Sequence, residues 1–133
     1  QGFTSKNGAL IVDDTYNANP DSMNAALDVL SRFDGTKVFV MGAIGELGAT
    51  SLQLHAEVGA YANEKGLAAL FALGEDAKAA SDASDVGQYF EGVDALLAAL
   101  RPYDVAGSTI LVKGSRFMQM ERVVEALLHT TGK

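Results

Sequence analysis

Apolar and polar residues divide the chain into five short apolar runs, each followed by a polar loop and an amphipathic stretch. The apolar runs lack the strict alternation of half-exposed strands and are typical of strands buried on both faces of a sheet. The amphipathic stretches repeat their apolar residues every three or four positions, as helices do. We predict strands over residues 9–12, 37–41, 67–73, 86–90 and 109–113, and helices over residues 21–33, 50–65, 75–83, 93–100 and 116–129.

Strand and helix alternate five times, which predicts an α/β fold with a mostly parallel sheet and helices on both faces. The carboxyl ends of parallel strands meet at one edge of a sheet, where ligands bind in open α/β folds. The loops expected at this edge are residues 13–19, 42–48, 74–76 and 113–116.

Two of the predicted helices have capping signals at their start. Asn19 can cap the first helix, and Pro20 suits its first position because the missing N–H would be unpaired there. Thr50 and Gln53 have the spacing of a capping box for the second helix.

Length, charge and cysteine content narrow the class of protein. The 133 residues suit one domain, residues 1–133, and the start at Gln1 is what a piece of a longer polypeptide would show. A net charge of -7 without a cluster of Lys and Arg argues against nucleic acid or an anionic membrane surface as partner. The chain has no cysteine and no apolar run of the ~18 residues that a membrane span needs. We therefore expect a cytoplasmic protein whose partners are small molecules or protein.

The loop after the first predicted strand is the first candidate for ligand binding. Asp13 and Asp14 could hold a ribose hydroxyl or a metal, and Tyr16, Asn17 and Asn19 offer an aromatic face and amides that suit a purine and ribose. Alternatively, Asp13 and Asp14 end the strand and accept hydrogen bonds from loop amides, and Asn19 is only a helix cap. The spacing leaves both interpretations open.

Lys113, Ser115 and Arg116 form the second candidate, beside the start of the last predicted helix. Positive charges there oppose the helix dipole, so they favour a convergent site for a carboxylate or phosphate. In the alternative interpretation, Ser115 caps the helix and the two cations are solvated.

The glycine-rich loop, residues 42–48, gives weaker signals. Its spacing is G-x-x-G-x-x-G, whereas dinucleotide-binding loops read G-x-G-x-x-G, and the chain contains no G-x-x-x-x-G-K-[ST] loop for a triphosphate. Glu46 is the one carboxylate of this loop and either touches a ligand or holds the loop. His55 follows on the next helix and has either a structural or a functional role. The sequence shows no Ser/His/Asp arrangement and no His pair with metal-binding spacing.

Four blocks of sequence carry a resemblance to a known family. They are DDTYNANPDSM at residues 13–23, GAIGELG at 42–48, HAEVG at 55–59 and VKGSRFMQMER at 112–122. In this order they resemble the C-terminal domain of the Mur ligases, the ATP-dependent amide ligases of peptidoglycan synthesis. One departure is Ala43, where the family usually has Asp.

The resemblance implies a Rossmann-like domain, the third of a three-domain enzyme. It points to the ligase that joins D-Ala-D-Ala to UDP-N-acetylmuramoyl-tripeptide. In that reaction ATP phosphorylates the tripeptide carboxylate, the dipeptide amine attacks the acyl phosphate, and phosphate leaves. The N-terminal domain would bind the UDP-sugar, and the central domain would hold the P-loop, the magnesium ions and most of the phosphate contacts. We therefore expect no catalytic or metal-binding residue in this chain and no ligase activity from it alone.

The resemblance also implies roles for individual residues. Those expected to meet the adenine and ribose of ATP are Asp14, Tyr16, Asn17 and Asn19. Those expected to meet the dipeptide carboxylate or the developing acyl phosphate are Lys113, Ser115 and Arg116, with Glu46 and His55 as further candidates. A sister Mur-type ligase for another amino acid and a free-standing α/β ligand-binding module are the alternative interpretations.

Overall fold

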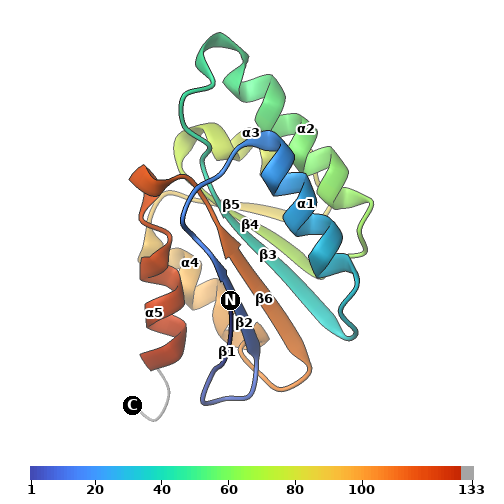
Figure 1. Cartoon of the computed structure of the whole chain (residues 1–133), viewed down its shortest axis with the longest axis vertical. Helices are drawn as coiled ribbons and strands as arrows, with labels where there is room; N and C mark the ends of the chain where they lie inside the picture. The colour runs from blue at the N-terminus through green and yellow to red at the C-terminus, as the bar shows by residue number, and fades with distance from the viewer. Residues whose placement is uncertain (130–133) are drawn as a thin grey trace.

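In this computed structural model, residues 1–129 are described and form one six-stranded sheet with helices on both faces (Figure 1). The strands are β1 (Gly2–Thr4), β2 (Leu10–Asp14), β3 (Thr36–Gly42), β4 (Ala69–Leu73), β5 (Gly87–Phe90) and β6 (Ser108–Lys113). The helices are α1 (Pro20–Ser31), α2 (Ser51–Asn63), α3 (Lys78–Asp82), α4 (Val93–Leu100) and α5 (Glu121–His129). None of the helices within residues 1–129 combines the length and the apolar character needed to cross a membrane.

The strand order is β1-β2-β6-β3-β4-β5. The five strands from β2 to β6 are parallel, which confirms the predicted α/β fold class. The exception is β1, which pairs antiparallel with β2 and which the sequence analysis missed. The last strand, β6, lies between β2 and β3, so the chain returns to the middle of the sheet after it has built one edge.

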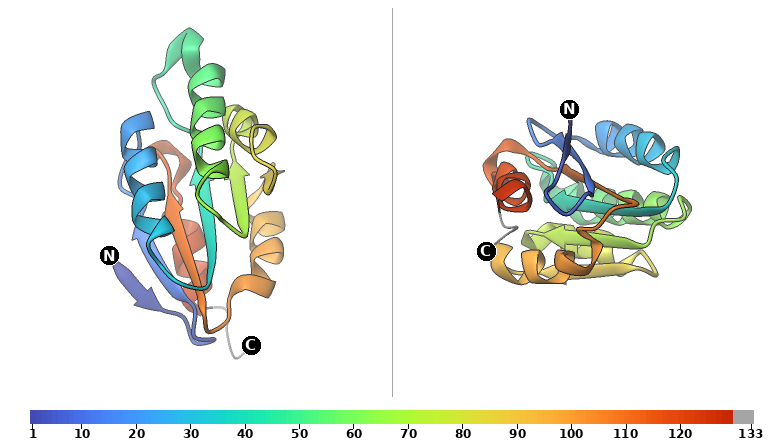
Figure 2. Two further views of the ribbon diagram at one scale, coloured as in Figure 1. Left: turned by 90° about the vertical axis from the view of Figure 1, so that its right-hand side faces the viewer. Right: turned by 90° about the horizontal axis from the view of Figure 1, so that it is seen from below.

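The helices divide between the two faces of the sheet (Figure 2). Helices α1, α2 and α3 cover one face, and α4 and α5 cover the other. Successive residues of the central strands therefore point into two different cores. In β3, Phe39 and Met41 face α1 and α2, while Val38 and Val40 face α4 and α5.

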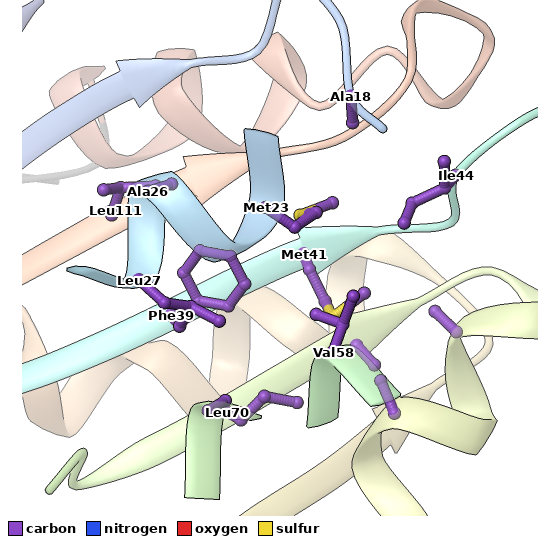
Figure 3. Packing of buried hydrophobic residues seen from close by; sticks show 14 of the residues in the cluster. Ala18, Met23, Ala26, Leu27, Phe39, Met41, Ile44, Val58, Leu70 and Leu111 are labelled. Carbon is purple, nitrogen blue, oxygen red and sulfur yellow. The ribbon is translucent and has the colours of Figure 1, made fainter. Parts of the chain in front are cut away.

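The core under α1 and α2 extends to the edge where the parallel strands end (Figure 3). Met23 and Phe39 lie in its middle and are fully buried. Ala18 and Ile44, from the loops after β2 and β3, close it at the top with 7% and 3% of their surface exposed. Both loops are therefore anchored by apolar contacts below the surface that they present.

The start of α1 agrees with its sequence signals. The side chain of Asn19 accepts a hydrogen bond from the backbone N–H of Ser22, and the Ser22 hydroxyl accepts one from the backbone N–H of Asn19. Pro20 is the first helical residue. This reciprocal pair leaves fewer unpaired amides at the helix start.

The predicted capping box of α2 is wrong. A short 3-10 turn, Gly48–Thr50, precedes this helix, and the Thr50 hydroxyl donates to the carbonyl of Leu47. The helix itself begins at Ser51.

The predicted start of the last helix at Arg116 is also wrong. Arg116–Met118 forms a 3-10 turn, Gln119 takes the left-handed conformation with φ 52°, and α5 begins at Glu121. A helix over residues 116–129 would turn Phe117 toward the core together with Met120 and Val124, but Phe117 is 66% exposed. The left-handed residue separates the turn from the helix, so the cations near residue 115 do not stand at the start of an α-helix.

Helix α1 is joined to α2 by a polar cluster on the surface. The Tyr61 hydroxyl donates to the Asp28 carboxylate, and Lys65 forms an ion pair with Asp28 at 3.0 Å. The hydrogen bond from Tyr61, followed by that from Lys65, holds the pKa of Asp28 below its ordinary value. The hydrogen bonds with Asp28 and Tyr61 raise the pKa of Lys65.

We expect Asp28→Asn to reduce stability at neutral pH and to matter less in acid. The pKa of Asp28 is lowered in the folded state, so its stabilising effect is present above the ordinary carboxyl pKa and is lost as the pH falls through the lowered value. Urea unfolding of both proteins between pH 2 and pH 7 should show midpoints that converge below about pH 4. A difference independent of pH would contradict this assignment.

We expect Gly59→Ala to destabilise the fold by about 2–3 kcal/mol, because a methyl group there would overlap the backbone carbonyl of Ala80 between α2 and α3. Gly2→Ala is the matched control, since its new methyl would meet only Leu10 at 3.6 Å. This control should change the free energy of unfolding by less than about 0.5 kcal/mol. Equal urea midpoints for the two variants would contradict the packing.

Candidate functional site

The carboxyl edge of the sheet carries the candidate site because β6 brings its loop between those of β2 and β3 (Figure 1). In the register of the sheet, Lys113 pairs with Asp14 on one side and with Met41 on the other. Three hollows line this edge, with volumes of about 730, 500 and 310 Å³. Phe117 contributes to the walls of all three.

Several polar side chains of the loop after β2 are used by the loop itself. Asp13 accepts hydrogen bonds from the backbone N–H and the hydroxyl of Thr15, at 3.1 and 2.6 Å. Asn17 accepts one from the N–H of Ala18 through its side-chain oxygen. Asn19 caps α1. The alternative roles, in which Asp13 satisfies loop amides and Asn19 caps a helix, are therefore present in the structure.

Lys113 is buried and ties this loop to the end of β6. Its ammonium group donates to the carboxylate of Asp14 and to the backbone carbonyl of Asn17, each at 3.0 Å. The Lys113 side chain is 4% exposed, and that of Asp14 is 44% exposed. The cation thus holds the loop from below, while the outer part of the Asp14 carboxylate faces solvent.

Ser115 joins three loops at one oxygen atom. Its hydroxyl accepts a hydrogen bond from the backbone N–H of Gly45 at 2.8 Å and donates a longer one to the carbonyl of Ala18 at 3.4 Å. The residue is 6% exposed. It does not cap the turn that follows it with its side chain.

Arg116 and Tyr16 stand on the outer surface of the same edge. The guanidinium carbon of Arg116 lies 5.1 Å from the centre of the Tyr16 ring, within the range of a cation–π contact. Both residues are exposed, Tyr16 to 75%. They line the hollow of about 730 Å³ together with Asp13, Asp14, Thr15, Phe117, Gln119 and Glu121. A volume of this size is typical of small-molecule sites.

The glycine loop forms the neighbouring wall. Glu46 is exposed, has φ 63°, and lines both smaller hollows. Ala43, the departure from the family pattern, is 5% exposed and belongs to the apolar core. Its neighbour Gly74 lies so near that a methyl there would be 3.0 Å from the Ala43 methyl. The Ala43 side chain is therefore packed against the core, at the inner wall of the hollow of about 310 Å³.

His55 is at the same edge but behind it. The residue is fully buried, and both ring nitrogens have partners inside the protein. The backbone N–H of Ile44 donates to Nε2 at 2.9 Å, and Nδ1 lies 2.8 Å from the carbonyl oxygen of Ser51. His55 consequently presents no nitrogen to the solvent side of the loop.

The structure adds one residue that sequence reasoning missed. The exposed ring of Phe117 stands between the hollows and lines all three. Its position directly after the polar run from Lys113 to Arg116 was a signal for exposure. Among the side chains that the structure describes, those of residues 1–128, no group of three or more His, Cys, Asp or Glu could hold a metal ion.

A family model described as "Mur ligase, glutamate ligase domain" matches residues 2–116. The UDP-N-acetylmuramoyl-tripeptide--D-alanyl-D-alanine ligase of Escherichia coli K12 is 43% identical over 120 residues, which is 89% of this chain and 26% of that enzyme. The ligase of the same name from Bacillus subtilis 168 is 33% identical over 132 residues, 92% of this chain and 29% of that enzyme. This chain thus spans between a quarter and a third of the length of these relatives.

Solved structures give a similar result. The MurF ligase from Thermotoga maritima, in complex with ADP, superposes with a TM-score of 0.85 at 32% identity, over 96% of this chain and 29% of that one. MurF from Acinetobacter baumannii gives 0.84 at 38% identity, over 96% of this chain and 30% of that one.

We expect Lys113→Met to destabilise the domain by about 1–3 kcal/mol, because the carbonyl of Asn17 and the inner side of Asp14 would lose their donor. The amides of residues 14–19 should exchange faster with solvent. Lys6→Met, at an exposed lysine, is the control and should change stability by less than about 0.5 kcal/mol. Urea unfolding and amide exchange measure both effects, and equal behaviour of the two variants would contradict the role of Lys113.

Proposed function

Because this chain belongs to the Mur ligase family, whose glutamate ligase domain it matches over residues 2–116, we propose that it is the C-terminal domain of an ATP-dependent amide ligase. The ligase joins D-Ala-D-Ala to UDP-N-acetylmuramoyl-tripeptide in peptidoglycan precursor synthesis, the activity that the names of its relatives state. It acts in the cytoplasm and works together with a central and an N-terminal domain of the same polypeptide.

The observation that supports this proposal most directly is the hollow of about 730 Å³ formed by the loops after β2 and β6. It combines an exposed aromatic ring, a half-exposed carboxylate and a guanidinium group, on Tyr16, Asp14 and Arg116. An aromatic ring can stack on a purine, and a carboxylate can accept hydrogen bonds from ribose hydroxyls. The complex of the Thermotoga maritima relative with ADP supports a nucleotide as ligand.

In the proposed arrangement, Asp14, Tyr16, Asn17 and Asn19 face the adenine and ribose of ATP. The side-chain oxygens of Asn17 and Asn19 already accept backbone hydrogen bonds, so their amide groups remain as donors toward a ligand. The exposed Arg116 binds the carboxylate of the dipeptide or the developing acyl phosphate, and Glu46 stands beside it. Lys113 and Ser115 support this site from below and contribute their remaining hydrogen-bonding capacity.

The chemistry gives such a domain a clear purpose. An acyl phosphate is destroyed by water, so a domain that closes over ATP excludes solvent and aligns the dipeptide amine for attack. We assign Mg²⁺, which neutralises phosphate charge, mainly to the central domain. A sister ligase for a single amino acid is the second candidate, but the relatives compared above carry the name of the D-Ala-D-Ala enzyme.

We expect Mg-ATP to shift the amide resonances of residues 14–19 in a saturable NMR titration of this chain. D-Ala-D-Ala should then shift those of residues 113–118. Tyr16→Ala should weaken ATP binding about tenfold, because stacking of a base on an aromatic ring contributes ~1–3 kcal/mol. Val105→Ala, at an exposed residue before β6, is the control and should bind as the unchanged chain does. Shifts confined to other regions would contradict the assigned site.

The isolated chain should release no phosphate from ATP with both substrates present, whereas the full-length polypeptide should. Phosphate release by the full-length polypeptide with a single amino acid, and not with D-Ala-D-Ala, would favour the sister ligase. Turnover by the isolated chain would contradict the assignment of the catalytic groups to other domains.

A further inference from the structure

The side chain of His55 fixes the conformation of the glycine loop through one backbone amide. A backbone N–H can only donate, so Nε2 of His55, 2.9 Å from the Ile44 nitrogen, must be the unprotonated acceptor. Nδ1 then carries the hydrogen and donates it to the carbonyl of Ser51 at 2.8 Å. The two bonds select one neutral tautomer and fix the orientation of the ring.

The same connection continues to the loop after β4. The Ser51 hydroxyl lies 3.3 Å from Nδ1 of His55 and donates to the carboxylate of Asp76 at 2.6 Å. Asp76 belongs to the 3-10 turn Glu75–Ala77, which follows β4. One chain of hydrogen bonds therefore links the loops after β3 and β4 through the first turn of α2.

The glycine loop depends on such side chains because the pairing of β3 with β4 ends at its first residues, Gly42 and Ala43. The next amide along the loop, that of Gly45, donates to the hydroxyl of Ser115. Two successive amides are thus held by side chains from α2 and from the loop after β6. Between the glycine loop and the Glu75–Ala77 turn lies the hollow of about 310 Å³, whose wall also includes Ser51, Phe117 and Met118.

We infer that His55 is a positioning residue for the ligase reaction proposed above. It does not touch substrate. It holds Ile44, and through Ile44 it sets the place of Glu46 and the shape of the hollows that this loop lines. The effect on catalysis rests on the proposed function, whereas the effect on the loop rests on these hydrogen bonds alone.

Two substitutions of His55, to Gln and to Asn, test the roles of its two ring nitrogens separately. Glutamine can place its side-chain oxygen where Nε2 stands and accept from Ile44. Asparagine is shorter and reaches only the position of Nδ1, so it can donate to Ser51 but leaves the Ile44 amide without an acceptor. Gln53→Ala, at an exposed position of α2, is the surface control.

The loop is tested first in this chain by NMR. The unchanged protein should show a scalar coupling across the hydrogen bond between the Ile44 nitrogen and Nε2, and the ring nitrogen shifts of the Nδ1–H tautomer. Amide exchange of Ile44 and Gly45 should stay slow in His55→Gln and become at least tenfold faster in His55→Asn. An Nε2–H tautomer, or equal exchange in the two variants, would overturn the inference.

Catalysis is then measured in the full-length polypeptide at a temperature where all variants are folded. His55→Asn should raise KM for D-Ala-D-Ala about tenfold, the factor expected for one lost hydrogen bond, with a smaller change in kcat. His55→Gln should restore KM to within about threefold, and Gln53→Ala should not change it. Equal KM values for the Asn and Gln variants would overturn the positioning role, since a purely structural residue would change only the folded fraction. Absence of ligase activity in the unchanged polypeptide would instead refute the proposed function, while the NMR result would stand.

Discussion

The position of β6 between β2 and β3 is the constraint on which the candidate site depends. The loop after an outermost strand of a sheet has a neighbouring loop on one side only. The loop after β6 has one on each side, the loops after β2 and β3. Lys113 uses the first neighbour, through Asp14, and Ser115 uses both, through Ala18 and Gly45. The two side chains lie within three residues of each other, so one short segment holds the whole edge together.

The groups at this edge fall into an inner and an outer layer. Buried polar side chains form the inner layer and bond to the backbone of neighbouring loops, as Lys113, Ser115 and His55 do. Above them, Tyr16, Arg116 and Phe117 present their side chains to solvent. A ligand would therefore meet a surface whose shape is already set by bonds beneath it, which reduces the entropy lost on binding.

Much of the fold could be predicted from the sequence, because strands buried on both faces need continuous apolar runs. Residues 37–41 and 109–113 are such runs, and they form β3 and β6 with small changes at their ends. The strand β1 was missed because its three residues are mostly exposed and join the sheet through backbone bonds, which leave no apolar pattern. The start of α5 was misplaced because Gln119 takes a left-handed conformation that a non-glycine residue rarely signals.

The site could be predicted as a set of loops but not as a division of roles. Sequence reasoning treated Lys113, Ser115 and Arg116 alike, whereas burial separates the first two from the third. Which side chain accepts from which loop amide depends on the packing of segments up to about a hundred residues apart, and local spacing in the sequence does not reveal that packing.

The glycine loop illustrates this dependence on packing. Three successive amides of this loop, at Ala43, Ile44 and Gly45, donate to Leu73, His55 and Ser115 in turn. In many nucleotide-binding folds, amides at this place bind phosphate oxygens. Here two of the loop glycines serve close packing instead, Gly42 against Met120 and Gly45 against Phe117, whereas Gly48 has open space around it and a positive φ of 61°. In α/β proteins of this kind, a glycine-rich loop can bind phosphate only through amides that have no acceptor inside the protein. The number of glycines in the loop does not tell whether such amides are present.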